Sequence, residues 1–324
     1  MTEKKLGLLI HPEEISEYWE RLILSSGVNS VGIHPRGGGN AHETLADFLE
    51  RLQGGAFDSF LEAMRAHSIE VELECHALSW LLPREHFADH PTWFRMNEEG
   101  VRTPKHNLCP SSEEALSFVE ERSAHLASML PFHGRYYHLW IDDTSRGGVC
   151  HCERCRALSP SDQALTVYHA ILKGLRRHDP SAKLGFLAYH ETMAPPTVSP
   201  MEGIYLEYAP INRRMDRFIG DGTCEENRRE TEHLDALLAH FGKEDAEVLE
   251  YWLDNSLFCG WKLPYKRLVP DRDLLRKDLT YYRQKGFSRI ATFACFLGED
   301  YAREFGVPPV EEYGRAGADA ILTK

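Results

Sequence analysis

Basic residues are scarce relative to acidic ones. The chain of 324 residues carries 37 lysines and arginines against 50 aspartates and glutamates, which gives a formal net charge of −13 at pH 7. The basic residues form no stripe along the sequence. Nucleic acids and anionic membrane surfaces attract proteins through clustered lysines and arginines. We therefore predict that this protein binds neither a nucleic acid nor a membrane.

Long apolar runs and a dense set of cysteines are also missing. No segment approaches the roughly 20 apolar residues of a membrane-spanning helix. The apolar run near the N-terminus, Leu6 to Ile10, is shorter than a signal-peptide core, and no small-residue cleavage site follows it. Eight cysteines in a chain of this length are too few for a disulfide scaffold. These absences predict a soluble, cytoplasmic protein in a reducing compartment.

Short strand-like apolar segments alternate with amphipathic helical patterns along the chain. Helical periodicity marks residues 111–130, 161–178, 223–241 and 271–286. Ser111 and Glu114 have the spacing of a capping box at the start of the first of these helices. The eight expected strands are residues 6–11, 28–34, 70–78, 136–143, 183–190, 203–209, 247–254 and 289–296.

Eight alternating units predict the α/β class and, within it, a closed (β/α)8 TIM barrel. Strand–helix–strand units form parallel sheets with right-handed crossovers, and eight of them close into a barrel. The alternative is an open doubly wound sheet, but no glycine-rich dinucleotide motif follows the first strand. We interpret "RGGGN" (36–40) as a flexible loop. No linker is visible, so we predict one TIM-barrel domain over residues 1–324.

The connection between the fifth and sixth expected strands differs from the others. Residues 191–203, "ETMAPPTVSPMEG", contain three prolines. Proline has no backbone N–H and cannot sit inside a regular helix. We therefore expect the helix of this unit to be missing or vestigial.

Polar and aromatic residues gather where the expected strands end. In barrels of this type the chemistry lies at the carboxyl ends of the strands. We therefore expect substrate-binding side chains there. The candidates are His11, His76, Trp80, Trp140, Tyr189, His190, Tyr208, Arg213, Trp252, Asp254 and Asn255.

Alternation along two strands groups carboxylates with indoles. Side chains two residues apart share one face of a strand, which pairs Trp140 with Asp142, and Glu250 with Trp252 and Asp254. We expect both faces to point into the barrel mouth. Carboxylates and aromatic rings together suit a sugar, whose C–H faces stack on rings while its hydroxyls bond to polar groups. For any single residue, the plainer alternatives are a helix cap or loop ion pair for a carboxylate and core packing for a tryptophan.

Several segments together resemble a bacterial family catalogued as a domain of unknown function. They are "HPTWFRMNEEGVR" (90–102), "NLCPSSEEALSFVEERSA" (107–124), the aspartates followed by "CHCERC" (150–155), and "LAYHET" (187–192). The resemblance covers most of the chain, from the first expected strand through the seventh. It implies a barrel related to β-hexosaminidase-type glycosidases, and some relatives are described as endo-acting β-N-acetylglucosaminidases.

The end of the fourth expected strand, "HLWIDD" (138–143), is similar to the His-x-Gly-Gly-Asp-Glu ending of hexosaminidase barrels. By that resemblance Asp142 orients the substrate's 2-acetamido group and Asp143 is the general acid. Trp140 and Ile141 stand where that motif has glycines. An adjacent carboxylate raises the pKa of a general acid. We therefore predict a retaining glycoside hydrolase that acts on a β-linked glycoside, with an N-acetylated hexosamine as the implied sugar.

A second group must stabilise the oxocarbenium-like carbon. It is either the substrate's own acetamide, held by Asp142, or a protein carboxylate. Glu250 is the first candidate carboxylate and Asp254 the second. If Glu250 is the nucleophile, its carboxyl should lie about 5–5.5 Å from that of the acid, whereas about 6.5–9.5 Å would indicate inversion.

Two other function classes stay open. One is a metal-dependent barrel hydrolase or isomerase of a sugar, and the other is a carbohydrate-binding protein without turnover. In all three classes the expected partner is a carbohydrate, and nothing indicates an organic cofactor or an oligomeric state. The candidate ligands for the metal-dependent class are His11, His34, Glu74, His76, Asp142 and His190.

A Cys-x-Cys-x-x-Cys cluster follows the paired aspartates: Cys150, Cys152 and Cys155. Three thiols this close can converge on one ion, and soft thiolates favour zinc over magnesium or calcium. We expect Cys109 as the fourth ligand, with His151 as the alternative. We predict a structural zinc site that holds the loop carrying the aspartates. Free thiols on a mobile loop, or an adventitious disulfide, are the competing interpretations.

Overall fold

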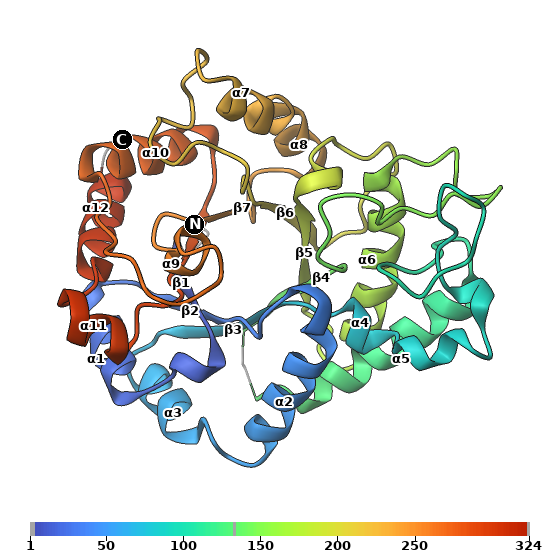
Figure 1. Ribbon diagram of the computed structural model, residues 1–324, viewed down its shortest axis with the longest axis horizontal. Helices are drawn as coiled ribbons and strands as arrows, with labels where there is room; N and C mark the ends of the chain where they lie inside the picture. The colour runs from blue at the N-terminus through green and yellow to red at the C-terminus, as the bar shows by residue number, and fades with distance from the viewer. Residues whose placement is uncertain (1–3, 132–133, 323–324) are drawn as a thin grey trace. The chain divides into compact units, whose positions relative to one another are not determined.

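The computed structural model describes residues 4–131 and 134–322. Eight parallel strands close into a barrel in chain order, with helices around it (Figure 1). This confirms the predicted (β/α)8 barrel. The strands are β1 Lys5–Ile10, β2 Ser30–Ile33, β3 Glu70–His76, β4 Tyr136–Trp140, β5 Lys183–Ala188, β6 Ile204–Tyr208, β7 Glu247–Glu250 and β8 Arg289–Phe293.

Twelve α-helices and five short 3-10 helices lie in the described ranges. The α-helices are α1 Glu17–Ser26, α2 Ala41–Gln53, α3 Asp58–Ala66, α4 Leu78–Leu81, α5 Glu113–Met129, α6 Pro160–Arg176, α7 Glu225–Thr231, α8 Leu234–Phe241, α9 Asn255–Phe258, α10 Arg272–Lys285, α11 Glu299–Phe305 and α12 Val310–Leu322. The 3-10 helices are η1 Pro12–Glu14, η2 Gly38–Asn40, η3 Arg84–Phe87, η4 Pro91–Trp93 and η5 His190–Thr192.

All eight predicted strands are present, but each ends earlier than its sequence pattern suggested. β4 ends at Trp140 instead of residue 143, and β7 ends at Glu250 instead of residue 254. The polar residues beyond these points belong to loops. The alternation of side chains between two faces of a strand therefore does not extend to Asp142, Trp252 or Asp254. The direction in which these side chains point cannot be read from the strand pattern.

The connection between β5 and β6 contains only η5, which confirms the expected loss of a helix there. Elsewhere two helix predictions need correction. The helix expected over residues 223–241 is two helices, α7 and α8. The N-cap of α5 is Ser112, whose hydroxyl accepts a hydrogen bond from the Ala115 N–H at 3.3 Å. Ser111, predicted to be the cap, instead lies 3.0 Å from the sulfur of Cys155.

The chain divides into two compact units. The first consists of residues 1–34, 55–72 and 207–324, and the second of residues 35–54 and 73–206. In the first unit α12 packs beside α1 and α10, and in the second α5 lies along α6 (Figure 1). The single domain expected over residues 1–324 stays a prediction, and its residues 1–3, 132–133 and 323–324 lie outside the described residues.

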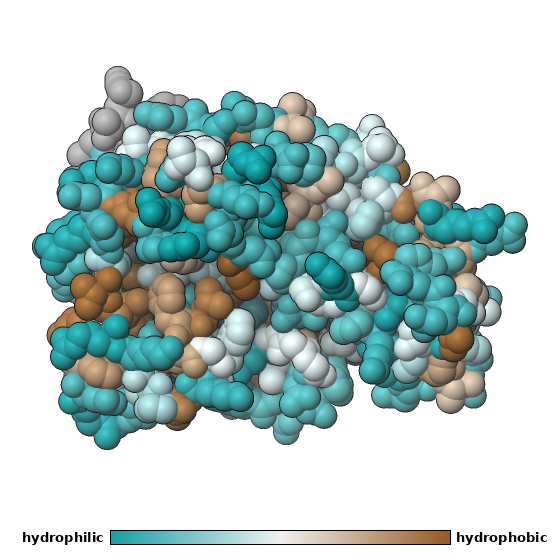
Figure 2. All heavy atoms as spheres, turned by 45° about the horizontal axis from the view of Figure 1, so that its top comes forward, coloured by the Kyte–Doolittle hydropathy of each residue, from teal (hydrophilic) through white to brown (hydrophobic). Residues whose placement is uncertain are grey.

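Hydrophilic side chains predominate on the face shown in Figure 2. Large apolar side chains that are exposed in the described ranges are Val101, Trp261, Leu263, Val269 and Val307. In the same ranges, every helix is too short or too polar to cross a membrane.

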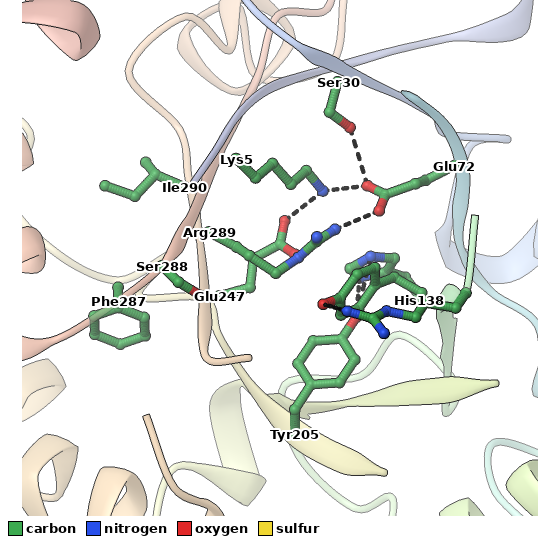
Figure 3. Close-up of polar contacts among 12 residues, drawn as sticks. Lys5, Ser30, Glu72, His138, Tyr205, Glu247, Phe287, Ser288, Arg289 and Ile290 are labelled. Carbon is green, nitrogen blue, oxygen red and sulfur yellow. Dashed lines mark hydrogen bonds and ion pairs between the residues drawn. The ribbon is translucent and has the colours of Figure 1, made fainter. Parts of the chain in front are cut away.

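An interior charge ring, made of Lys5, Glu72, Glu247 and Arg289, lies in the first unit (Figure 3). Lys5 pairs with Glu72 and, at 2.7 Å, with Glu247. Arg289 pairs with Glu72 and, at 2.8 Å, with Glu247. The Ser30 hydroxyl donates a further hydrogen bond to Glu72 at 3.2 Å. Two cations and two anions are thus paired where each of these four side chains is at most 4% exposed.

The ring belongs to the amino-terminal half of the barrel. Lys5, Glu247 and Arg289 are each the first residue of their strand. This end of a TIM barrel serves stability, whereas the chemistry lies at the carboxyl ends of the strands. We therefore assign the ring to the stability of the barrel.

Breaking the ring should cost far more stability than breaking a surface pair. Arg289→Met leaves two buried carboxylates with one cation, and loss of one partner of a buried ion pair costs about 3–5 kcal/mol. Urea denaturation measures this as a fall in the free energy of unfolding. The control is Arg229→Met, whose pair with Glu225 is solvent-exposed, so the expected loss is below about 1 kcal/mol. Equal losses in the two variants would show that the ring is not isolated from water.

Candidate active site at the end of strand β4

The candidate site lies in the second unit, where β3, β4 and β5 end. Strand register pairs His76 with Trp140 across β3 and β4. Asp143 follows β4 by three residues, and Tyr189 follows β5 directly. The site is therefore built from three adjacent strand ends, as the barrel geometry predicts.

Asp143 is the accessible carboxylate of the aspartate pair. Its side chain is 31% exposed. Its Oδ1 accepts a hydrogen bond from the Tyr189 hydroxyl at 3.4 Å and lies 3.9 Å from Nε2 of His76. A carboxylate that faces solvent thus has a phenol and an imidazole behind it.

His76 is held in one orientation. Its Nδ1 lies 2.6 Å from the carbonyl oxygen of Ile141. A carbonyl only accepts hydrogen bonds, so Nδ1 carries a proton and donates it. The edge of the Trp140 indole packs against the ring with centroids 5.1 Å apart. Nε2 is therefore the nitrogen that faces Asp143.

Asp142 has a different environment from Asp143. Its carboxylate forms an ion pair with Arg84 and its side chain is only 8% exposed. It borders a small cavity of about 40 Å³, which has room for a few water molecules. Asp142 is thus paired with Arg84, whereas Asp143 faces His76 and Tyr189. The expected effect of Asp142 on the general acid stays a prediction.

Side chains from two other segments hold the strand-four loop, residues 141–155. The Asn107 amide accepts a hydrogen bond from the Asp142 N–H at 3.0 Å and donates one to the Gly148 carbonyl at 2.9 Å. The Glu191 carboxylate accepts from the N–H groups of Gly147 at 3.1 Å and Gly148 at 3.0 Å. A Cβ at Gly148 would lie 2.8 Å from Asn107 Nδ2, so glycine is needed there.

His190 completes the polar groups near Asp143. Its ring lies 3.9 Å, centroid to centroid, from that of Tyr189. Burial lowers the pKa of His190, against the opposing effect of the Asp143 carboxylate. His190 is therefore neutral at neutral pH and can act there as a hydrogen-bond donor or acceptor.

Four cysteine side chains converge beside the loop: Cys109, Cys150, Cys152 and Cys155. Their sulfurs all lie within 4.8 Å of one another, and Cys109 Sγ is 3.7 Å from the sulfurs of Cys152 and Cys155. Tetrahedral zinc with Zn–S bonds of about 2.3 Å requires sulfurs about 3.8 Å apart. The side chain of His151 is directed toward Glu98 instead. The convergence of Cys109 with the three clustered cysteines is thereby confirmed, and the donor set fits zinc.

Hydrogen-bond donors surround the sulfurs, as thiolates require. The Met96 N–H donates to Cys150 Sγ at 3.3 Å, and Arg102 Nη1 lies 3.8 Å from the same sulfur. Hydrogen bonds from Cys150 and Cys155 lower the pKa of Cys109, whereas the contact with Cys109 raises that of Cys155. Ionisation of one thiol therefore makes ionisation of its neighbour less favourable. Ionisation of all four thiols requires a cation that compensates their charge.

Glu250 faces an outer helix, so the prediction that it points into the barrel mouth is wrong. Its carboxylate is fully buried and accepts hydrogen bonds from Arg213 at 2.6 Å and from the Tyr282 hydroxyl of α10 at 2.5 Å. Arg213 also bonds to Asp278 of α10 at 2.7 Å. Glu247 is the residue of β7 that faces the interior, and side chains alternate, so Glu250 three positions later faces outward.

Three predicted substrate-binding residues of the first unit also form hydrogen bonds with the outer helices. The Trp252 indole N–H donates to Asp278 at 3.1 Å. The Tyr208 hydroxyl donates to the carbonyl oxygen of Glu230 in α7 at 3.0 Å. Arg213 is committed to the buried carboxylates of Glu250 and Asp278. All three are buried against helices, so the expectation that they line an open barrel mouth does not fit the structure.

Contacts within the protein were found for four further candidates. The guanidinium carbon of Arg122, a residue of α5, lies over the Trp80 indole, 4.0 Å from the ring centroid. Asp254 caps α9: its carboxylate accepts hydrogen bonds from the N–H groups of Ser256 at 3.0 Å and Leu257 at 3.2 Å. The Asn255 amide donates to a backbone carbonyl at 3.3 Å. Trp140 is 2% exposed and supports His76 rather than walling an open pocket.

The ligands proposed for a catalytic metal do not form one group in the described residues: His11 converges with Glu14 and Cys295, and Glu74 with Glu72, His138 and Glu247. His11 Nδ1 lies 3.0 Å from the carbonyl oxygen of His34. The Glu14 oxygens near His11 accept hydrogen bonds from two backbone N–H groups at 3.1 and 3.0 Å. Within residues 4–131 and 134–322, no group of converging metal ligands includes His34, His76, Asp142 or His190.

Three residues near the site escaped the sequence analysis: Gly37, Asn107 and Glu191. A Cβ at Gly37 would lie 2.9 Å from Cδ2 of His76 and 3.3 Å from Oδ2 of Asp143, so the "RGGGN" segment packs on this pair. Asn107 and Glu191 belong to the two segments, 107–124 and 187–192, that carry the family resemblance. That resemblance was the available signal for them, and none existed for Gly37.

Comparison with protein families identifies residues 48–241 as a "Domain of unknown function (DUF4838)". The chain belongs to this family. The resemblance to a family of unknown function is thereby confirmed, and the DUF4838 match includes the strand-four loop and the four cysteines. No curated protein matches the sequence.

The DUF4838 chain has the fold of several solved glycoside hydrolases. Gan42B, a GH42 β-galactosidase, superposes with a TM-score of 0.59 at 14% identity over 99% of this chain, which spans 57% of Gan42B. A Bacteroidetes-affiliated GH5 cellulase gives 0.54 at 12% identity, covering 100% of this chain and 92% of that one. PbGH5A from Prevotella bryantii B14 gives 0.51 at 10% identity, covering 95% and 86%. At these identities the likeness is one of fold.

Glu191→Gln should loosen the strand-four loop. Only one oxygen would remain to accept hydrogen bonds from the two glycine N–H groups. We expect faster amide hydrogen exchange in a peptide covering residues 142–150, with exchange in the barrel strands unchanged. Glu202→Gln, an exposed glutamate of the same unit, is the control. Equal exchange in the two variants would mean that Glu191 does not hold the loop.

Proposed function

We propose that this DUF4838 protein is a glycoside hydrolase with Asp143 as its general acid. The observation that carries the proposal is the partly exposed Asp143 carboxylate at the end of β4, backed by His76 and Tyr189. The fold adds support, because the solved proteins with this fold include a β-galactosidase and a cellulase. The same arrangement favours a glycoside hydrolase over a carbohydrate-binding protein without turnover, because glycoside cleavage needs a positioned acid.

The acid protonates the leaving oxygen while positive charge develops on the sugar carbon. Glu250 is withdrawn as the nucleophile, because it is bonded to Arg213 and Tyr282. For a retaining reaction this favours the substrate's own acetamide, as in substrate-assisted glycosidases. We therefore propose a β-linked N-acetylhexosamine glycoside as the substrate. The ion pair with Arg84 supports a positioning role for Asp142.

Neutral sugars are the competing substrate class. PbGH5A was solved in complex with a xyloglucan tetradecasaccharide, and Gan42B is named for β-galactosides. Neither sugar carries an acetamide. A retaining enzyme for these sugars needs a protein nucleophile. Aryl β-N-acetylglucosaminides, β-galactosides and β-glucosides therefore form the panel that decides between the two classes.

We also propose that the four cysteines hold a structural zinc ion. Cys109 lies two residues after Asn107, and Cys150 lies two residues after Gly148, so the ion would fix both partners of the Asn107–Gly148 hydrogen bond. A site with four thiolates has no position left for substrate. Its proposed role is to hold the loop that carries Asp143. The eight free cysteines fit the proposed cytoplasmic location.

Asp143→Asn should slow hydrolysis selectively. For glycosides with poor leaving groups we expect a fall in kcat/KM of about a hundredfold to ten-thousandfold, the usual contribution of a general acid. Dinitrophenyl glycosides should change much less, because their leaving group needs no proton. Asp89→Asn, an exposed aspartate of the same unit, is the control. A small and equal fall on both substrates would refute the assignment. Oligosaccharide binding by a wild-type protein without hydrolysis would favour a carbohydrate-binding protein.

The zinc proposal predicts about one zinc per chain in protein purified without added metal. Elemental analysis measures it directly. Cys152→Ser should lose the ion, lower Tm and reduce activity, whereas Cys224→Ser, outside the cluster, should change none of the three. A metal-free protein whose stability is the same in both variants would contradict the proposal.

A further inference from the structure

We infer that His76 is the proton partner of Asp143, so that the acid of the proposed reaction is an imidazole–carboxylate pair rather than a pair of aspartates. This inference rests on the proposed function and names a further residue of the same site. Its basis is geometric: Asp142 is bonded to Arg84 and 8% exposed, whereas His76 faces Asp143.

The tautomer of His76 decides what it can do. Nδ1 donates its proton to the Ile141 carbonyl at 2.6 Å, so the lone pair of the neutral ring is on Nε2. Nε2 lies 3.9 Å from Asp143 Oδ1. A protonated carboxyl can donate to this nitrogen, and a carboxylate can accept from the imidazolium. A proton can therefore pass between the two groups once they come within hydrogen-bond distance.

The separation of 3.9 Å is longer than a direct hydrogen bond. Catalytic hydrogen bonds are often long before substrate binds and tighten in the complex. A single bridging water also spans such a gap. The Asp143 side chain, which is 31% exposed, can turn about its χ angles to close it.

Burial separates the roles of the two groups. The His76 side chain is 8% exposed, with the Gly37 backbone against one part of the ring and the Trp140 edge against another. The Asp143 carboxylate is 31% exposed and is therefore better placed than the imidazole to reach a sugar, so the proton passes to the substrate through the carboxyl group.

The other titratable groups facing the pair are few. Tyr189 donates to Asp143 at 3.4 Å, and its ring centroid lies 6.3 Å from that of His76. His190 lies beside Tyr189, and burial lowers its pKa. Gly37 and Trp140 bring no charge. Asp142 and Glu191 line the same small cavity as His76, but Asp142 is paired with Arg84 and Glu191 accepts hydrogen bonds from the Gly147 and Gly148 N–H groups. Asp143 is the carboxylate that lies 3.9 Å from Nε2 of His76.

The proton balance of the cycle is simple. As the C1–O bond breaks, its electron pair goes to the leaving oxygen, which takes the proton from Asp143. Water then supplies the hydroxyl at C1, and its second proton returns to the Asp143 carboxylate. Between turnovers His76 Nε2 accepts the proton of Asp143 and gives it back. The net reaction consumes one water and leaves the pair unchanged.

His76→Gln tests this inference, because glutamine can form hydrogen bonds but cannot take up a proton. We expect kcat on glycosides with poor leaving groups to fall about tenfold or more, with KM unchanged. Dinitrophenyl glycosides should be hydrolysed at nearly the wild-type rate. The alkaline limb of the pH–rate profile should move to lower pH, because no imidazole then retains the shared proton. The control is His67→Gln, whose Nδ1 also bonds a backbone carbonyl, at 2.9 Å, but which is exposed.

The outcomes separate the inference from the proposed function. A wild-type protein that cleaves no aryl glycoside refutes both. Wild-type activity with an unchanged pH–rate profile in His76→Gln refutes the inference alone. An equal loss on all substrates together with a lower Tm assigns His76 a structural role and also refutes it. If His76→Gln does not fold, His76→Asn replaces it, since asparagine also forms hydrogen bonds without taking up a proton and should cause the same selective loss.

Discussion

The hydrogen bonds of one side chain, Asn107, hold the turn that carries the candidate acid. Residues 141–149 have no helix or strand of their own, so their shape depends on contacts from other segments. Asn107 forms hydrogen bonds with the Asp142 N–H and the Gly148 carbonyl. The Glu191 carboxylate accepts hydrogen bonds from the N–H groups of Gly147 and Gly148. Cys109 lies two residues from Asn107 and belongs to the thiol cluster. This arrangement accounts for the occurrence of thiols and carboxylates together in the sequence, if the proposed zinc site restrains the loop that presents Asp143.

Buried charge is divided among three tasks. The interior charge ring pairs Lys5 and Arg289 with two glutamates at the amino ends of the strands, far from the ends where barrel chemistry occurs. A second network joins Glu250 to α10 through Arg213 and fastens an outer helix to β7. The third set, Asp143 with its imidazole and phenol, keeps a partly exposed carboxylate. Burying a charge is costly unless it is paired, and the exposure of Asp143 distinguishes it from the structural groups.

Features with a local signal could be predicted from the sequence. Alternating apolar segments identified all eight strands, and prolines identified the connection without a helix. Thiol spacing identified the cluster of Cys150, Cys152 and Cys155, and Cys109 was expected from its place on the preceding loop. Features that depend on distant residues could not. Arg84 is 58 positions from the Asp142 that it pairs with, and the close approach of Gly37 to His76 arises only in the folded chain. The outward orientation of Glu250 was missed because β7 is short and its interior position is occupied by another glutamate, Glu247, that the apolar pattern did not distinguish.

The central claim is that Asp143 delivers the proton to the glycosidic oxygen. A crystal structure of the Asp143→Asn variant with an uncleaved aryl glycoside, one that the wild-type protein hydrolyses, tests it most directly. The account predicts the glycosidic oxygen within about 2.6–3.2 Å of the residue 143 side chain, with His76 behind that side chain and out of contact with the sugar. A glycosidic oxygen bonded to a different carboxylate, or a sugar bound away from the end of β4, would contradict it.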